Sequence, residues 1–274
     1  MSRYSMHINH NLTIQRLLTI IKALQEGMCD IESLAYVLGT TSTVVDRLFL
    51  PELKWMGLVS REGLNLTQTG EQLANLSDRY PSLVAECIHF IIFDMKLKDQ
   101  PSKEWAYQFL IHTIWTEGSE KISLDKSDLA TSVVNAASSA FNLQPQRIAF
   151  SKDSVQAIFN YLAEFHPRVL SRKGKGFIYQ NRNFCSELST LWAISHLYKV
   201  ESIERGMRIF LTESRRRELC KLLLLEEGAL NFILRNLKST TDYESGGLFD
   251  FSDRGGFGEW VLLRDLFPAP KVPE

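Results

Sequence analysis

The sequence lacks the features of a membrane-spanning or a disulfide-rich protein. Its longest nearly apolar runs, 87–93 and 222–225, fall far short of the ~20 residues that a transmembrane helix needs. The four cysteines are widely and irregularly spaced, and none forms a C-x-x-C pair. The first twelve residues contain no apolar stretch of the kind found in secretory signals. We therefore expect a soluble, cytoplasmic protein with no membrane contact.

The sequence also lacks the common catalytic motifs. It contains no G-x-x-x-x-G-K-[ST], no G-x-S-x-G and no H-E-x-x-H. Glu86 and His89 have the i, i+3 spacing of a di-iron ligand pair, but such a site needs a second pair. His112 cannot complete one, because the residue three positions before it is Phe109 and not an acid. We expect a protein that is not an enzyme, with no catalytic residues, no metal and no cofactor.

A surplus of one charge is absent overall but present locally. The chain has 31 Lys and Arg against 32 Asp and Glu, a net charge of -1, which excludes an evenly basic nucleic-acid binder. Between Glu164 and Glu187 there is no acidic residue. All the basic residues of that stretch fall within 168–182, namely Arg168, Arg172, Lys173, Lys175 and Arg182. They predict a single anion-binding patch.

The first eighty residues contain the capping and breaking residues expected of three helices and a hairpin. An apolar period of 3.6 predicts a helix over 12–25, and Asp30 is a plausible N-cap for a second helix that Gly39 ends. Ser42 is expected to cap a third helix, kinked at Pro51. Its buried face is predicted to consist of Val45, Leu48, Phe49 and Met56. A hairpin with its turn at 61–63 follows.

The stretch SLAYVLGTTSTVVDRLFLPELKWMGLVSREGLNLTQTG resembles the winged helix-turn-helix superfamily in its short turn before the third helix, its GLV entering the hairpin and its LT..G leaving it. The resemblance implies a third helix that enters the major groove of DNA. Its outward face is expected to carry Thr43, Arg47, Leu50 and Lys54, with Arg61 at the wing tip. Asp46, Glu52 and an exposed Leu50 favour the alternative, a unit that contacts protein or is purely structural.

The middle of the chain predicts a second unit of the same kind. Apolar periodicity indicates helices over 83–98, 103–116 and 127–141, and a helix capped by Ser151 that Pro167 ends. The residues around Arg172-Lys173-Gly174-Lys175-Gly176 form a predicted hairpin. Shifting the first unit by 110 positions superposes four apolar residues, Val45, Leu48, Phe49 and Val59, on Val155, Ile158, Phe159 and Val169. The basic tip either contacts phosphates or is a solvated turn.

The last part of the chain predicts helices and one more hairpin. Helices are expected over 186–200, from Thr212 to 225, and over 227–238, before a hairpin made by 248–251 and 259–263. Arg215, Arg216 and Arg217 occupy the first turns of the helix that begins at Thr212, where the helix dipole disfavours cations. They either face DNA or an acidic partner, or form a surface paired with Glu213 and Glu218.

The fold expected is mainly α with small β-hairpin wings, in tandem winged-helix-like units joined by a helical middle segment. Its predicted divisions are 1–80, 81–200 and 201–274. The order of SLVAECIHFIIF, EWAYQFLIHTIW and SKDSVQAIFNYLAEF after a winged unit resembles a helical bacterial family of unknown function encoded in DNA-phosphorothioation and phage-defence loci. That resemblance implies a DNA-associated role beside modification or restriction proteins.

The first function expected is therefore double-stranded DNA binding in a bacterial phage-defence, DNA-modification or regulatory system, together with other proteins of that system. The first alternative is a protein-interaction subunit of a defence complex that never touches DNA. A transcriptional repressor is the second alternative, and the sequence leaves open whether the chain forms a homodimer.

Overall fold

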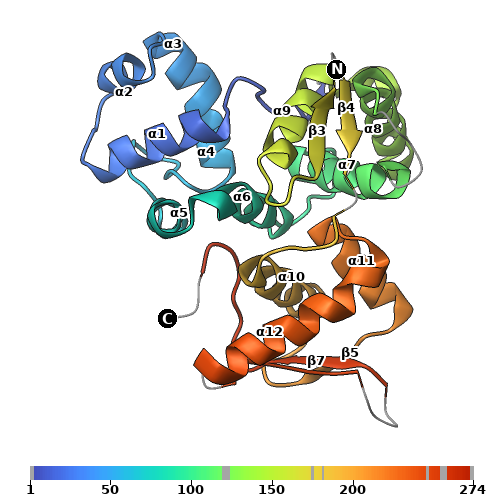
Figure 1. Cartoon of the computed structure of the whole chain (residues 1–274). Helices are drawn as coiled ribbons and strands as arrows, with labels where there is room; N and C mark the ends of the chain where they lie inside the picture. Colours follow the sequence, from blue (N-terminus) through green and yellow to red (C-terminus); the bar gives the residue numbers. More distant parts are fainter. Residues whose placement is uncertain are drawn as a thin grey trace.

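The computed structural model describes residues 3–118, 124–173, 176–180, 182–244, 247–253 and 258–271. The fold is mainly helical with small β-sheets, as the sequence predicts. Figure 1 shows three lobes, two side by side and one below them. Each lobe combines helices with a short β-pairing, and the buried apolar side chains of the three lobes form one continuous core.

The first unit (residues 12–79) agrees with the sequence prediction in element order. Its elements are α1 (Ile14–Gln25), α2 (Ile31–Val37), α3 (Ser42–Val44), the π turn η1 (Val45–Phe49), α4 (Leu50–Trp55) and α5 (Gln68–Arg79). Asp30 caps α2 as expected, because its carboxylate accepts the Ser33 N–H at 2.7 Å. A short antiparallel pairing of Val59 with Leu66 forms the hairpin.

The π turn corrects the predicted face of the third helix. The Leu50 N–H bonds to the Val45 carbonyl five residues back, so α4 starts afresh with Pro51 in its first turn, where a missing N–H is tolerated. The wider turn rotates the following side chains. Leu50 is therefore buried and Leu48 is exposed, the reverse of the prediction from a regular helical period.

The second unit (residues 103–179) begins earlier than the sequence indicates. Its elements are α7 (Lys103–Gly118), α8 (Lys126–Ala140), the 3-10 turn η3 (Pro145–Arg147), β2 (Ile148–Ala149), α9 (Lys152–Ala163), β3 (Leu170–Lys173) and β4 (Gly176–Tyr179). The predicted hairpin is present as β3 and β4, and β4 also bridges Leu124, which precedes α8. Helices expected to be a connecting segment are thus part of this unit.

The third unit (residues 187–263) contains the three helices and the hairpin that the sequence predicts, together with a strand, β5, that it does not predict. Its elements are α10 (Glu187–Val200), β5 (Arg208–Phe210), α11 (Glu213–Leu223), the 3-10 turn η4 (Glu227–Ala229), α12 (Leu230–Glu244), β6 (Phe249–Ser252) and β7 (Trp260–Leu263). The last strand lies between the other two, in the order β5-β7-β6, just as β4 lies between β3 and Leu124. A division at residue 200 would separate α10 from the helices it packs against.

Helix α6 (Val84–Phe93), entered through the 3-10 turn η2 (Pro81–Leu83), lies where the three lobes meet. All ten of its residues are buried, which explains its nearly uninterrupted apolar sequence. It packs against α5 of the first unit, α7 and α9 of the second, and α10 of the third. The three units are therefore held around one central helix.

Hydrogen bonds at the C-terminal end of α11 join the third unit to the central helix and to the second unit. The last carbonyls of a helix have no partner within it and must find donors when they are buried. Four successive carbonyls accept from four different elements. The donors, in the order of Leu222, Leu223, Leu224 and Leu225, are His89 Nε2 at 2.8 Å, Arg182 Nη1 at 3.1 Å, Tyr179 OH at 3.3 Å and Trp115 Nε1 at 2.7 Å.

Candidate nucleic-acid interface

The third helix and the wing of the first unit form one continuous surface. Lys54 Nζ donates to the Arg61 carbonyl at 3.2 Å, which holds the end of α4 against the hairpin turn. Thr43, Arg47 and Arg61 are exposed, and Lys54 is half-buried. Among the described residues, no ion pair engages Arg47 or Arg61. Of the four side chains expected to face outward from this helix, only Leu50 is wrongly placed.

This surface also carries exposed apolar side chains. Tyr36 at the end of α2 is 88% exposed, and Val37 and Leu48 are exposed too. Asp46 lies beside Arg47 in the sequence and is also exposed. The helix-turn-helix face of the first unit is therefore part apolar, with Arg47 next to Asp46 on the helix and Arg61 next to Glu62 at the wing.

The second unit presents a different picture, because its third helix is covered. Seven of the twelve residues of α9 are buried. The segment at the start of the chain runs along it: β1 (Tyr4–Ser5) pairs in parallel with β2, the Ile8 N–H donates to Ser154 Oγ at 3.2 Å, and Tyr161 OH donates to the Leu12 carbonyl at 3.2 Å. Helix α9 is thus a core helix here, and it cannot enter a DNA groove.

The basic patch predicted around the second wing is divided by the structure. Arg168 and Arg172 are exposed, whereas Lys175 and the side chain of Lys173 lie outside the described residues. Arg182 is 2% exposed, so its prediction as a DNA contact is wrong. Its Nη2 pairs with Glu86 Oε1 at 2.6 Å and also donates to the His166 carbonyl at 3.0 Å. Because a buried cation needs a partner, this arginine belongs to the core.

In the third unit the third helix, α12, has an exposed face, but its basic side chains are paired with acids. Arg235 pairs with Asp253, and Lys238 pairs with Asp250 at 2.7 Å, so the acids of its own hairpin meet the cations of α12. The three arginines at the start of α11 are also paired, although not with the acids expected. Arg215 binds Glu201, Arg216 binds Glu259, and Arg217 lies near Glu227 and over the Trp115 ring.

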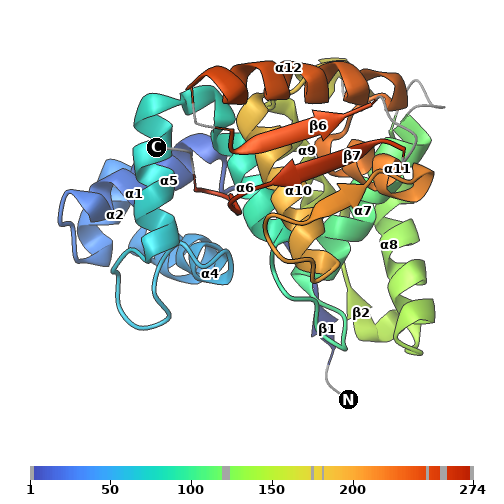
Figure 2. The ribbon, with the colours of Figure 1, turned by 90° about the horizontal axis from the view of Figure 1, so that it is seen from below.

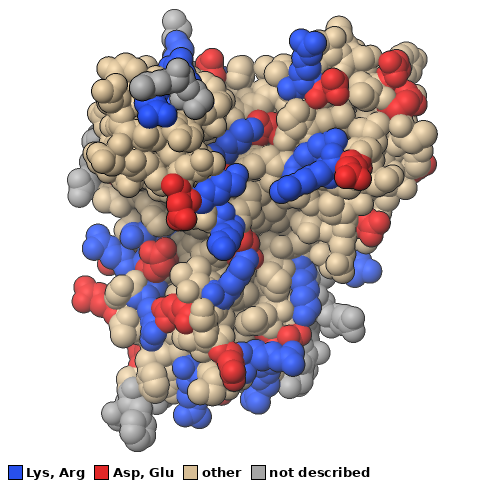
Figure 3. Space-filling view, turned by 180° about the vertical axis from the view of Figure 1, so that it is seen from behind, with Lys and Arg blue, Asp and Glu red and all other residues tan. Residues whose placement is uncertain are grey.

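Two further lysines lie beside the first unit, and sequence reasoning missed them. Lys103 pairs with Glu52 at 2.5 Å and stands over the Trp55 ring, and Lys98 pairs with Glu104 at 3.3 Å. Burial raises the pKa of the Glu52 carboxyl. The run MKLKDQPSK, rich in lysine, is the signal that could have found them. Figure 3 shows Lys and Arg side chains across the middle of the face opposite to Figure 1, with Asp and Glu among them.

Glu86 and His89 do not form a ligand pair. Glu86 accepts from Arg182 and from Ser189 Oγ at 2.5 Å. Since the Leu222 carbonyl can only accept, His89 Nε2 carries the proton and Nδ1 accepts from Tyr107 OH at 2.8 Å. Burial lowers the pKa of His89 from 6.5 to about 3. Within the described part of the chain, no group of three metal-ligating side chains comes together.

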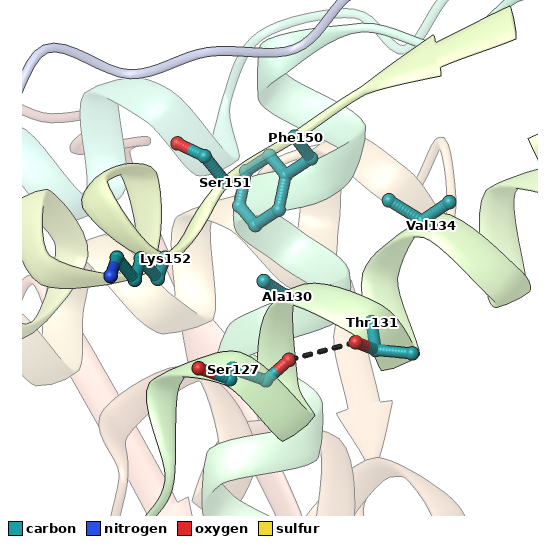
Figure 4. Close-up of a pocket in the computed structure, with 7 residues that line it drawn as sticks. All are labelled: Ser127, Ala130, Thr131, Val134, Phe150, Ser151 and Lys152. Carbon is teal, nitrogen blue, oxygen red and sulfur yellow. Dashed lines mark hydrogen bonds between the residues drawn. The ribbon is translucent and has the colours of Figure 1, made fainter. Parts of the chain in front are cut away.

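One shallow hollow of about 340 Å³ lies between α8 and the start of α9. Figure 4 shows its lining: Ser127, Ala130, Thr131, Val134, Phe150, Ser151 and Lys152. Thr131 Oγ1 donates to the Ser127 carbonyl at 2.9 Å, so part of its polar lining is already satisfied. The lining contains no acid, histidine or cysteine, and it offers no acid–base pair for catalysis.

No helix among the described residues is both long enough and apolar enough to span a bilayer. Comparison of the chain with family models, with curated proteins and with solved structures gives no significant match.

Proposed function

We propose that this chain is a non-catalytic DNA-binding protein of the winged helix-turn-helix superfamily, which docks on duplex DNA through its first unit. The observation that carries the proposal is the joined surface of α4 and the first wing. The Lys54–Arg61 bond holds helix and hairpin together, and Arg47 and Arg61 keep their charges free for phosphates. Lys103 covers the later part of this third helix, at Glu52 and Trp55, but its earlier residues Thr43, Arg47 and Leu48 stay exposed. The third helix of the second unit is instead buried along most of its length, and the cations of α12 are paired with the acids of its own hairpin.

The second wing adds phosphate contacts to this proposal. Arg168 and Arg172 are exposed, and the sequence places Lys173 and Lys175 beside them. Because α9 is covered, no helix of this unit would enter a groove. The wing would help to position the protein on the duplex and would add no sequence preference. The role expected from the family resemblance, in a cytoplasmic defence, DNA-modification or regulatory system, is part of the same proposal, and a repressor is one form of it.

The test is a comparison of two matched pairs of alanine substitutions. Arg47→Ala with Arg61→Ala removes the free cations of the first unit, and Arg235→Ala with Lys238→Ala removes the paired cations of the third. Affinity for a labelled duplex, measured by anisotropy at low salt, should fall for the first pair by about tenfold or more, since each lost phosphate contact weakens binding. The second pair should stay within about twofold of the wild type. An equal effect of both pairs contradicts the assignment.

A second candidate function has its own observation. Tyr36, Val37 and Leu48 are exposed apolar side chains of the helix-turn-helix, and exposed apolar side chains that cluster mark protein contacts. On this alternative the first unit docks a protein of the same system or a second copy of the chain. It predicts no duplex binding at low salt, and self-association in sedimentation that Tyr36→Ser abolishes.

A further inference from the structure

The outer face of the third unit's sheet is open. Strands place alternate residues on opposite faces, so Ile209, Phe251 and Val261 point into the core and are buried. Their neighbours make two rows on the other face, Phe210–Trp260–Ser252 and Arg208–Leu262–Asp250. Figure 2 looks onto β6 and β7 from this side, and no other element lies in front of them.

This face carries flat rings beside a cation. Phe210, the last residue of the three-residue strand β5, is 45% exposed. Trp260, directly opposite it on β7, is half-buried. The Arg208 guanidinium carbon lies 4.4 Å from the Trp260 ring centroid, which places a planar cation over the tryptophan face. Two stacking surfaces therefore lie side by side, the Phe210 ring and the Arg208 guanidinium.

The acids in and next to strands β6 and β7 are already paired with cations from outside the sheet. Asp250 binds Lys238, Asp253 binds Arg235 and Glu259 binds Arg216, in each case a cation supplied by α11 or α12. Among the described residues, Arg208 has no acidic partner, and Arg264, which follows β7, donates to the Gly247 carbonyl. Arg208 and Arg264 are therefore available to bind an anionic ligand.

We propose that this face binds single-stranded nucleic acid, with unpaired bases stacked on Phe210 and on Arg208, and phosphates held by Arg208 and Arg264. Stacking platforms edged by cations are the chemistry by which proteins hold unpaired strands without reading their sequence. An added peptide strand would use the free edge of β5, whereas stacked bases would use the rings and the cation on the face of the sheet. The proposal does not depend on duplex binding by the first unit.

The experiment uses the full chain and labelled 15-mers of deoxythymidine and of uridine, with anisotropy read at about 50 mM salt. Phe210→Ala should weaken binding about tenfold, since base–aromatic stacking accounts for a loss of that order on alanine substitution. Arg208→Ala should weaken binding and flatten the salt dependence by about 0.7 per phosphate lost. Phe184→Ala, an equally exposed phenylalanine in the loop before α10, is the matched control and should bind like the wild type.

The two oligonucleotides separate DNA from RNA, and loss of either complex in Phe210→Ala supports the site. An unchanged urea midpoint for Phe210→Ala confirms that the variant is folded. Two results overturn the proposal: no binding of either 15-mer by the wild type, or equal affinity for Phe210→Ala and Phe184→Ala. Loss of duplex binding in the first-unit variants, with 15-mer binding retained, would leave this proposal standing.

Discussion

Arg182 and Glu86 are 96 positions apart in the sequence and form a fully buried ion pair, with Nη2 and Oε1 2.6 Å apart. Glu86 belongs to the central helix α6, and Arg182 follows the second wing. The same guanidinium donates to the Leu223 carbonyl at the end of α11 in the third unit. One side chain thus joins the central helix to two of the three units.

The first prediction concerns this pair. Glu86→Ala leaves the Arg182 charge buried without compensation, and breaking a buried pair in this way costs about 3–5 kcal/mol of the free energy of unfolding. The measurement is urea denaturation. The matched control is Asp78→Ala, which removes the exposed Lys22–Asp78 pair and should cost about 1 kcal/mol or less. A small loss for Glu86→Ala, similar to the control, would contradict the structural role.

The second prediction concerns the pH dependence of stability. Burial lowers the pKa of His89 to about 3 in the folded state, against 6.5 for the unfolded chain. The unfolded state therefore takes up a proton first as pH falls, and the stability that neutral His89 contributes is complete above pH 6.5 and is lost progressively below it. Between pH 7 and pH 5 the loss is about 2 kcal/mol, at 1.36 kcal/mol per pH unit.

His89→Gln removes the titrating group while an amide can still donate to the Leu222 carbonyl. This variant should be less stable than the wild type at pH 7, but should lose about 2 kcal/mol less between pH 7 and pH 5. Phe93→Leu, which alters a ring packed 4.7 Å from His89, is the control. It should lower stability equally at both pH values, because it leaves the histidine in place. Parallel pH profiles for the wild type and His89→Gln would refute the prediction.

The third prediction concerns the closest backbone approach in the first unit. A Cβ added at Gly70, in the first turn of α5, would lie 2.1 Å from the carbonyl oxygen of Leu58 in the hairpin. Neither backbone segment can move without disturbing the unit, so Gly70→Ala should cost about 2 kcal/mol or more. Gly228→Ala, where a Cβ meets no atom within 4 Å, should change the urea midpoint little. Equal midpoints for the two variants would contradict the contact.

Local patterns predicted the elements whose residues are close in sequence. The Asp30 cap, the hairpin around residues 58–66 and the hairpin of β3 and β4 all arise from neighbouring residues and their turns. The helices and hairpin of the third unit were predicted too, but strand β5 was missed because it has three residues and its partner β7 lies some fifty positions later. No short window of sequence contains that pairing.

The candidate site shows the same division. Exposure of Arg47, Arg61 and Arg172 follows from their places on the third helix, the first hairpin turn and strand β3. Burial of Arg182 does not, since its partner Glu86 is contributed by a distant helix. Leu50 is buried and Leu48 is exposed, the reverse of the prediction, because one π turn interrupts the helical period. The covering of α9 by residues 4–12 is likewise a contact between distant segments.

The last prediction concerns the second wing. Binding to duplex phosphates releases counterions, so log K falls with log salt by about 0.9 per phosphate neutralised. Replacing Arg172, Lys173 and Lys175 by Ala should weaken binding to all duplexes alike and flatten that slope by about two to three units. Arg47→Ala with Lys54→Ala should also weaken binding, and unlike the wing variant it should change the preference among duplex sequences, because those side chains lie on the third helix. Arg182→Ala should change stability and not the salt slope, since its charge is buried against Glu86. The measurement is a salt titration of duplex binding for all four proteins, and an unchanged slope in the triple variant would show that the basic hairpin is only a solvated turn.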